Sequence, residues 1–385
     1  MLIGIVGAPN KGKSRFFASV CRVEVQVADY PFTTIDPNRA VAYLRVKCPS
    51  VELGIVSTPR NGRLEDGMRD VPVQLVDVAG LVPGAHEGRG MGNKFLDDLS
   101  SADGFLQIID ASGRTDLGGQ AARDFDLELE AKFLEEEMRF WILGILKKNA
   151  AKFRGRDADA LSAALSGLSY SAQIVQRCAA NAGMNLKRIG GGKEELERLS
   201  HELAKNAKPK IIVANKCDVA GARERALALA GKEYDIVCAS AEYEYALQRA
   251  KRAGLVEYSD GAREFRVAEK ADAKQRAALE KIAKFMEENG GTGVYAALSR
   301  LVFEKIGMIV AYPVENENSY SDSLGNVLPD AILMPAGSTV IELAGKVHAD
   351  LAKKFIGAVD ARTKRKVGKE HPLKNGDIIK IIAGK

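Results

Sequence analysis

One stretch near the start of the chain has residue types and spacing suited to phosphate binding, Gly7-Ala-Pro-Asn-Lys-Gly-Lys-Ser14. It follows a short apolar run, which predicts a buried strand, and precedes a segment that begins like a helix. In a G-x-x-x-x-G-K-S loop the glycines let backbone N–H groups cradle phosphates. Lys13 then reaches the terminal phosphates, and the Ser14 hydroxyl ligates Mg²⁺. The alternative is an ordinary tight turn before a helix, and the strand–loop–helix context favours the phosphate site.

Further elements with the chemistry of a nucleotide site follow this loop in order. Asp77-Val-Ala-Gly80 ends a predicted strand, where the carboxylate can hold Mg²⁺ through water and Gly80 can offer its N–H to a γ-phosphate. The aspartate of Asn215-Lys-Cys-Asp218 can accept two hydrogen bonds from guanine N1–H and N2–H₂, donors that adenine lacks. Ser240-Ala241 can present a backbone N–H to guanine O6. Taken singly, each is compatible with a strand-end cap, but four ordered matches favour a guanine nucleotide site.

The length and composition restrict the class of protein. A chain of 385 residues predicts two or three domains, and 46% hydrophobic with 28% charged residues is ordinary for a soluble protein. No apolar run reaches 18 residues, so no membrane span is expected. The first apolar segment is too short for a secretory signal and lacks a basic leader. Five scattered cysteines without a C-x-x-C pair argue against zinc and disulfides, which favours a cytoplasmic location.

The positive charge is concentrated at the end of the chain. From Lys346 to Lys385 there are eleven Lys or Arg residues against four Asp or Glu, a surplus of +7 within a net charge of +5. The other 345 residues therefore carry −2. This asymmetry predicts a polyanionic partner at the C-terminal end, and a merely solvated Lys-rich surface is the alternative.

Hydrophobic periodicity predicts helices between two parts of an α/β pattern. Two stripes with spacings of three and four residues flank the basic turn Lys147–Arg156 and predict an antiparallel helical hairpin. The first stripe contains Leu127, Ala131, Leu134, Met138, Trp141 and Ile145, and the second contains Leu161, Leu165, Leu168, Ala172, Val175 and Ala179. The α/β pattern resumes with the strand Pro209–Ala214.

Past Gly307 the pattern changes to strands and turns, with strands predicted near Val310–Val314, Asp330–Met334 and Ile378–Ile382 and a helix over Val340–Phe355. The predicted fold class is therefore α/β, with three parts. Residues 1–114 and 207–307 form a nucleotide domain with a mostly parallel sheet. Residues 115–206 form an inserted all-α, coiled-coil-like arm, and residues 308–385 form a small α+β domain.

The order of these motifs resembles the translation-factor-related P-loop GTPases, within them the Obg family and most closely the YchF-type subfamily. The inserted helices and a C-terminal segment similar to the ubiquitin-like TGS domain extend the resemblance over nearly the whole chain. The motifs that carry it are Gly7 to Ser14, Tyr30-Pro-Phe-Thr-Thr-Ile-Asp-Pro-Asn38, Asp77-Val-Ala-Gly-Leu-Val-Pro-Gly84 and Gly90-Met-Gly-Asn-Lys-Phe-Leu96.

The resemblance implies roles for particular residues. Lys13, Thr34 and Gly80 would act in catalysis, with Thr34 rather than Thr33 as the switch threonine. Mg²⁺ would be held by Ser14, by Thr34 and, through water, by Asp77, and Asn10 matches an asparagine that ligates K⁺ in potassium-dependent GTPases. The nucleotide contacts would be Gly7, Ala8, Pro9, Asn10, Lys11, Gly12, Lys13, Ser14, Arg15, Asn215, Lys216, Asp218, Ser240 and Ala241.

Three departures from related proteins qualify this interpretation. Other YchF-type proteins have an altered base motif and prefer ATP, whereas the intact Asn-Lys-x-Asp here predicts GTP. Arg15 replaces a small hydroxyl residue after the phosphate loop, which predicts altered packing nearby. Leu81 stands where Ras-like proteins have a water-orienting glutamine, so slow intrinsic hydrolysis is expected without K⁺ or a partner. His86 and Glu87 are candidates for the missing group, or simply polar residues of the loop.

The sequence therefore predicts a GTPase that converts GTP to GDP and phosphate. It would act as a nucleotide-dependent switch on ribosomes or RNA in translation. The switch loops would be residues 29–38 and 80–93. Two alternatives remain: an RNA- or ribosome-binding scaffold with incidental turnover, and an ATPase like other YchF-type proteins. The sequence does not determine the oligomeric state.

Overall fold

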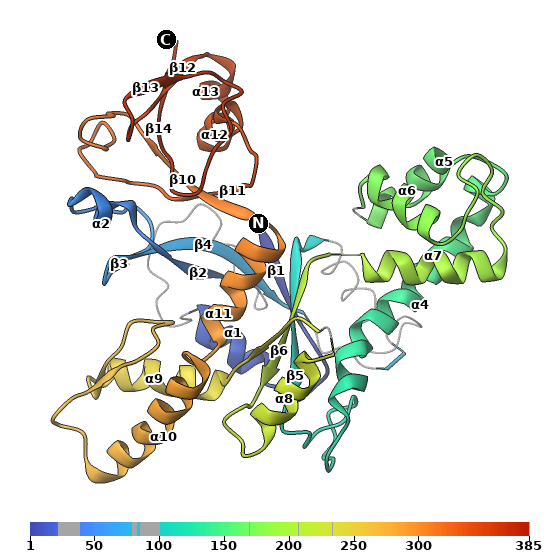
Figure 1. Cartoon of the computed structure of the whole chain (residues 1–385), viewed down its shortest axis with the longest axis horizontal. Coiled ribbons are helices and arrows are strands. Elements are labelled where there is room, and N and C mark those ends of the chain that lie inside the picture. The colour runs from blue at the N-terminus through green and yellow to red at the C-terminus, as the bar shows by residue number, and fades with distance from the viewer. Residues whose placement is uncertain are drawn as a thin grey trace.

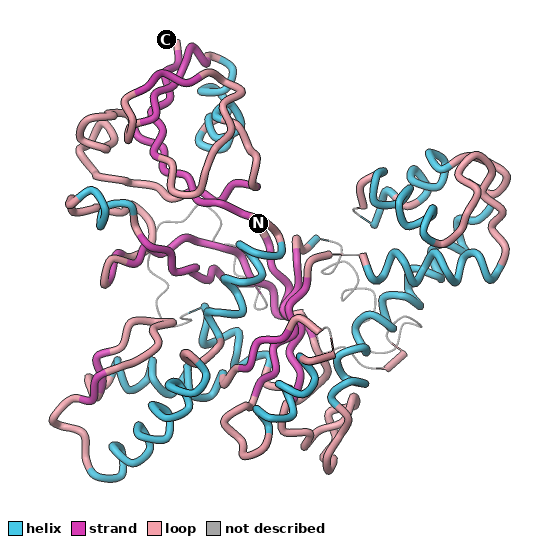
Figure 2. Tube along the Cα trace, in the orientation of Figure 1, coloured by secondary structure: helices cyan, strands magenta, loops and turns pink. Residues whose placement is uncertain are grey.

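The computed structural model describes residues 1–21, 39–78, 83–84, 101–168, 170–206, 208–232 and 234–384. Thr34, Gly80, Leu81, His86 and Glu87 lie outside the described residues, as does the Gly90–Leu96 motif. Within the described ranges the chain forms a central sheet domain, a helical arm and a second, smaller sheet domain (Figures 1 and 2). None of the described helices is long and apolar enough to cross a membrane.

Within the described ranges the central sheet has seven strands in the order β2-β4-β1-β5-β6-β7, with β3 paired to β4. The five strands from β4 to β7 along this path are parallel, and β2 and β3 are antiparallel to β4, which confirms the mostly parallel sheet. Ligands bind beyond the carboxyl ends of such parallel strands. The strands are β1 (Leu2–Val6), β2 (Arg39–Lys47), β3 (Leu64–Glu65), β4 (Met68–Asp77), β5 (Gly104–Asp110), β6 (Lys210–Asn215) and β7 (Ile236–Cys238).

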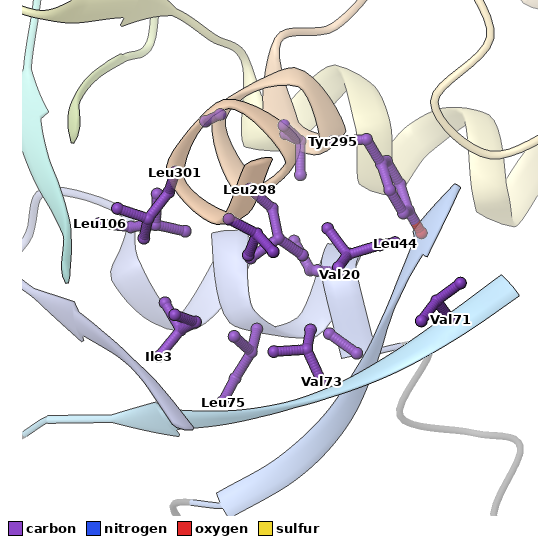
Figure 3. Close-up of a cluster of buried hydrophobic side chains, with 14 of the residues drawn as sticks. Ile3, Val20, Leu44, Val71, Val73, Leu75, Leu106, Tyr295, Leu298 and Leu301 are labelled. Carbon is purple, nitrogen blue, oxygen red and sulfur yellow. The ribbon is translucent and has the colours of Figure 1, made fainter. Parts of the chain in front are cut away.

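Helices cover this sheet and bury its apolar side chains. Figure 3 shows Ile3, Leu75 and Leu106 of the sheet close to Leu298 and Leu301, and all five are fully buried. Burial of each such side chain contributes roughly 1.5–3 kcal/mol. The helices of this domain are α1 (Lys13–Cys21), α2 (Pro49–Leu53), α8 (Ala222–Ala230), α9 (Ala241–Arg252), α10 (Ala273–Asn289) and α11 (Val294–Ser299), which continues as a π-helix (Arg300–Lys305). A small hairpin joins β8 (Val256–Glu257) to β9 (Arg266–Val267).

The arm is helical, as predicted, but its second apolar stripe does not form one long helix. The stripe is divided near Gly167 and Ser171, because the Ser171 hydroxyl accepts a hydrogen bond from the Ile174 N–H and starts a new helix. Leu161 and Val175 still face the arm's core, on separate short helices. The elements are α4 (Leu127–Phe153), α5 (Ala158–Ala164), a 3₁₀ turn (Ser166–Leu168), α6 (Ala172–Asn181) and α7 (Lys193–Lys205). Helix α4 packs against both α7 and α5, whereas α6 packs against α5 and α7 (Figure 1).

The C-terminal domain is a five-stranded sheet in the order β11-β10-β14-β12-β13, with two short helices. The single helix predicted over Val340–Phe355 is wrong, because His348 has an extended backbone (φ −161°, ψ 137°) that ends one helix and caps the next. The elements are β10 (Met308–Val314), β11 (Ile332–Pro335), α12 (Val340–Val347), α13 (Ala349–Lys353), β12 (Phe355–Asp360), β13 (Arg365–Val367) and β14 (Ile378–Ala383).

A buried arginine connects the C-terminal domain to the central sheet domain by hydrogen bonds. Arg69 of β4 is 1% exposed and donates hydrogen bonds to the carbonyls of Leu328 (3.1 Å) and Pro329 (2.8 Å). Nearby, the Thr58 N–H donates to the Val327 carbonyl, and the Val327 N–H donates back to the Thr58 hydroxyl. One apolar cluster contains residues of both domains, so the two domains share a core.

Candidate nucleotide-binding site

The predicted phosphate loop lies between β1 and α1. Its backbone conformation and its close contacts with neighbouring segments require glycine at two positions. Gly7 has φ +148°, and a Cβ there would lie 2.3 Å from the Ile108 carbonyl oxygen. Gly12 has φ +90°, and a Cβ there would lie 2.3 Å from the Asn215 side-chain nitrogen. The loop is therefore pressed against β5 and the end of β6, which brings the predicted phosphate and base motifs into contact.

Lys13 is buried within the loop that it would serve. Its Nζ donates a 2.9 Å hydrogen bond to the Ala8 carbonyl. Burial lowers the pKa of Lys13, and the carboxylate of Asp77 partly opposes that shift. The ammonium group is thus held by a backbone acceptor inside the phosphate loop, and a phosphate oxygen could replace that acceptor.

Ser14 and Asp77 converge at the start of α1, as the magnesium prediction requires. The Ser14 hydroxyl donates to Asp77 Oδ2 at 3.2 Å. The other oxygen, Oδ1, is buried without a hydrogen-bond partner among the described residues, and burial raises the pKa of this carboxyl group. One hydroxyl and one carboxylate with a free oxygen are the hard ligands that Mg²⁺ prefers, and Mg²⁺ usually completes its shell with phosphates and water. The pair fits Mg²⁺.

Asn215 joins the loops predicted to bind phosphate and base. Its side chain is 3% exposed, and Nδ2 donates to the Lys11 carbonyl at 2.9 Å. Its Oδ1 accepts a 3.0 Å hydrogen bond from the Ala241 N–H, so a guanine O6 would have to share that donor. Ser240 is fully buried and caps α9 by accepting from the Tyr243 N–H. One amide therefore fixes three segments that are distant in sequence.

The two charged residues of the base motif have different surroundings. Lys216 Nζ donates to the Asn10 carbonyl (2.9 Å) and pairs with Asp110 (2.9 Å), so its stem lies across the end of the loop. Asp218 is half-buried and has no hydrogen-bond or ion-pair partner within the described ranges. Its carboxylate is thus able to accept hydrogen bonds from a base.

Asp110 is a residue of this site that sequence reasoning missed. It is fully buried at the end of β5 and accepts hydrogen bonds from the hydroxyls of Ser112 (2.5 Å) and Thr115 (2.7 Å) as well as pairing with Lys216. Burial opposes its charge, but these hydrogen bonds together lower the pKa of Asp110. The apolar run Phe105–Ile109 directly before it, which has the pattern of a buried strand, was the available signal.

The segment between β5 and α4 packs against the phosphate loop, and sequence reasoning missed this as well. Asn10 Nδ2 donates to the Gly119 carbonyl at 2.8 Å. The Lys11 side chain is fully buried, donates to the Thr115 carbonyl and pairs with Glu130 of α4 at 3.0 Å. Burial raises the pKa of Glu130 to about 7, although Lys11 lowers it. Only the backbone of Lys11 is therefore free for a phosphate contact, and no sequence pattern identifies its partner.

Arg15 connects the phosphate-loop helix to the helix of the base site. Its guanidinium lies 4.2 Å from the centroid of the Tyr245 ring and its Nε pairs with Glu242 at 3.0 Å. Both Tyr245 and Glu242 belong to α9. The altered packing expected at this position is thus a bridge from α1 to α9, and its exposure limits the contribution of the ion pair to stability.

Helix α9 is anchored by a buried carboxyl group, which gives a testable pH dependence. Glu244 is fully buried and accepts hydrogen bonds from Tyr258 (2.8 Å), Thr292 (2.5 Å) and Gln248 (3.1 Å). Burial raises its pKa to about 7, and the nearby Asp260 adds to the shift. The protonated form is therefore favoured in the folded state. Its contribution to stability is full below about pH 4.5 and is lost as the pH rises through about 7.

We expect the free energy of unfolding to fall by roughly 2–3 kcal/mol between pH 5 and pH 8 through this group. Urea unfolding across that range measures the fall. Glu244→Gln should remove this part of the fall, because the amide cannot ionise, and should leave the share that comes from Glu130. Glu264→Gln, at an exposed position, should leave the profile unchanged. An unaltered profile in Glu244→Gln would contradict the assignment.

Family models match three parts of the chain. Residues 2–148 match a 50S ribosome-binding GTPase model, residues 213–316 match the G4 motif-containing domain of Obg-like GTPases of the YGR210 type, and residues 324–383 match the TGS domain. These matches cover the phosphate loop, the base motif and the strands β11 to β14 of the C-terminal sheet, respectively. They confirm the predicted fold class.

Two relatives resemble the chain over its full length. An uncharacterized GTP-binding protein of Methanocaldococcus jannaschii is 44% identical and covers 99% of both chains. The crystal structure of a GTP-binding protein from Pyrococcus horikoshii is 32% identical, covers all of both chains and has a TM-score of 0.77. A third relative, the ribosome-binding ATPase YchF of Haemophilus influenzae, is 29% identical over 55% of this chain and 56% of its own.

Proposed function

Because this chain belongs to the YchF/Obg-like family of P-loop GTP-binding proteins, we propose that it hydrolyses GTP and acts as a nucleotide-dependent switch on the ribosome or its RNA. One observation supports GTP as the nucleotide. The half-buried Asp218 stands without a protein partner among the described residues, beside an asparagine that fixes the phosphate and base loops together. A carboxylate in this position suits the two donors of guanine.

The choice between GTP and ATP needs a chemical argument, because one relative is named an ATPase. A site that uses a carboxylate to accept guanine N1–H and N2–H₂ would leave that carboxylate unpaired with adenine. An unpaired buried or half-buried charge costs affinity. We therefore favour GTP for this chain.

The chain's own residues suggest how hydrolysis would be assisted. Lys13 would exchange the Ala8 carbonyl for a phosphate oxygen, and the loop N–H groups would surround the phosphates. Mg²⁺, held by Ser14 and through water by Asp77, would neutralise charge on the transferring phosphoryl group. Asn215 keeps the base loop in register with the phosphate loop. Catalysis would thus come mainly from positioning and electrostatics.

A potassium ion beside the phosphates would supply positive charge, which partly offsets the lack of a water-orienting glutamine at Leu81. The Asn10 amide nitrogen is used by Gly119, so its Oδ1 is the atom available to a cation. We expect GTP turnover to rise at least about tenfold when K⁺ replaces Na⁺ at constant ionic strength, as for other charge-stabilising groups. Asn10→Ala should remove the rise while GTP affinity is nearly kept. Equal rates in both salts would refute the potassium role, and an equal loss of GTP affinity in both would indicate a structural role instead.

The C-terminal domain is the proposed contact with RNA, and the structure changes which of its charges to test. Arg362 pairs with Glu52 of α2 at 3.2 Å, and Lys364 donates to the Glu317 carbonyl and lies over the Tyr320 ring. Arg365 and Lys366 on β13 are exposed and form no ion pair among the described residues. Arg362 and Lys364 are thus held by partners within the protein, so Arg365 and Lys366 are the residues to substitute.

Co-sedimentation with ribosomes, with GDP or a non-hydrolysable GTP analogue, tests the proposal. We expect GTP-dependent binding that Arg365→Glu/Lys366→Glu weakens, and ribosome-stimulated turnover. Binding that ignores the nucleotide, without any stimulation of turnover, would favour a scaffold. Deleting the domain is a poor test, because Val310, Tyr312 and Ile378 pack in one cluster with Leu44 and Val71 of the central sheet domain.

A further inference from the structure

A second strongly basic surface lies at the outer end of the helical arm, formed by residues 147–156 and 185–193, hereafter the arm-end surface. The two segments are held together by backbone hydrogen bonds. The Gly155 N–H donates to the Ile189 carbonyl and the Ile189 N–H donates to the Arg156 carbonyl, both at 2.7 Å. Figure 1 shows these connections, after α4 and before α7, at the end of the arm farthest from the sheet. Charges distant in sequence therefore share one rigid surface.

The arm-end surface contains eight basic residues and no acidic ones. All eight are exposed, and none forms an ion pair with a described residue. They are Lys147, Lys148, Lys152, Arg154, Arg156, Lys187, Arg188 and Lys193. The surface thus has a formal charge of +8, larger than the net charge of the whole chain.

Two of the acidic residues beside this surface are used in local structure, whereas Glu194, next to Lys193, is exposed. Asp157 caps α5 by accepting from the Ala160 N–H at 3.1 Å. Glu195 accepts from the Gly191 N–H at 2.7 Å at the start of α7. Neither carboxylate pairs with a basic side chain of the arm end. Eight unpaired like charges repel one another, and a polyanion relieves that repulsion.

The apolar residues of these segments indicate which polyanion fits. The one aromatic residue, Phe153, and Ile189 are fully buried, so the surface offers no ring for base stacking. It also offers no exposed aromatic or large aliphatic side chain to enter a lipid interface. Charge without apolar anchors suits the phosphate backbone of RNA, which is bound with little regard to sequence.

We propose that the arm-end surface binds the phosphate backbone of RNA, as a contact separate from that of the C-terminal domain. This proposal rests on the proposed function only for the class of its partner, which is RNA. In Figure 1 the arm and the C-terminal domain project from different sides of the central sheet domain, which would let one molecule engage two segments of a large RNA. The two contacts would then strengthen each other through a raised effective concentration.

Charge neutralisation in the full-length protein tests this inference. The variant Lys152→Gln/Lys187→Gln/Arg188→Gln removes three charges whose side chains have no hydrogen-bond or ion-pair partner among the described residues. It spares Arg154, which donates to the Gly190 carbonyl. The control, Lys274→Gln/Lys281→Gln/Lys284→Gln, removes three exposed charges from α10, where acidic residues alternate with them. The probe is a 20-base-pair RNA duplex of mixed sequence, titrated over a series of KCl concentrations.

We expect the arm-end variant to bind the duplex at least about tenfold more weakly at low salt, and its slope of log affinity against log salt to fall by about 2. The control should stay within about twofold of the wild type. Equal affinities and slopes for both variants would overturn the inference. Loss of binding to anionic phospholipid vesicles with unchanged RNA binding would overturn it in favour of a membrane.

The outcomes separate this inference from the proposed function. If the wild type binds RNA and only Arg365→Glu/Lys366→Glu loses it, the arm-end surface is not a contact and the proposed function stands. If the wild type binds neither ribosomes nor the duplex, the proposed function itself fails. GTP turnover without RNA should be the same in the arm-end variant and in the α10 control variant, because neither cluster touches the nucleotide site.

Discussion

Asp218→Asn should change the nucleotide that this protein selects, with a loss of GTP affinity of roughly 10⁴-fold. Asp218 is the carboxylate of the base motif that has no protein partner among the described residues, so its substitution removes acceptors from a base and little from the fold. An asparagine amide would donate where xanthine, unlike guanine, presents a carbonyl. Xanthosine triphosphate should therefore bind the variant more tightly than GTP does.

Direct titration of GTP, ATP and xanthosine triphosphate measures this exchange. Glu224→Gln, at an exposed acidic residue of α8, serves as the matched control and should retain the wild-type order. In the wild type, GTP should exceed ATP by a factor of the same size. Equal affinities of the wild-type protein for GTP and ATP would end the guanine interpretation and favour the ATPase alternative.

Lys13→Met should mainly lower GTP turnover and Lys11→Met should mainly lower stability, although the two lysines are only two residues apart. Lys13 faces the Ala8 carbonyl inside the phosphate loop, and its loss should lower GTP turnover by about 10²–10³ with little change in stability. Lys11 is paired with Glu130 where both are buried, and its loss would leave a carboxyl group without its partner. Breaking such a pair costs about 3–5 kcal/mol.

Thermal or urea unfolding, combined with turnover by the folded fraction, distinguishes the two effects. The destabilisation by Lys11→Met should grow as the pH rises above 7, because burial favours the protonated form of Glu130. Adding Glu130→Gln should recover much of the stability, since the amide oxygen can still accept from the Asp110 N–H. If Lys11→Met impaired turnover and left stability unchanged, the side chain would be assigned to the nucleotide.

The sequence was sufficient for the elements whose signals are local. A strand followed by Gly7 to Ser14 specifies a loop geometry within a dozen residues, and the structure indeed requires glycine at both positions. The apolar runs predicted the parallel strands because a buried parallel strand has a short continuous apolar sequence. The arm's apolar stripes predicted most of its buried side chains, although Ala172 is exposed and Trp141 is half-buried. They did not predict that the helix stops near Ser171.

Sequence alone therefore determined the family, the parallel sheet, the helical insertion and the motifs that meet at the strand ends. Only the tertiary structure decided how neighbouring charges are used. Lys11 pairs with Glu130, Asp110 with Lys216 and Arg362 with Glu52, and the Arg15 guanidinium lies over the Tyr245 ring. Each of these pairs joins residues about a hundred or more positions apart. Local spacing fixes the backbone of a motif, but whether a charge is buried, paired or free depends on the distant segments packed against it.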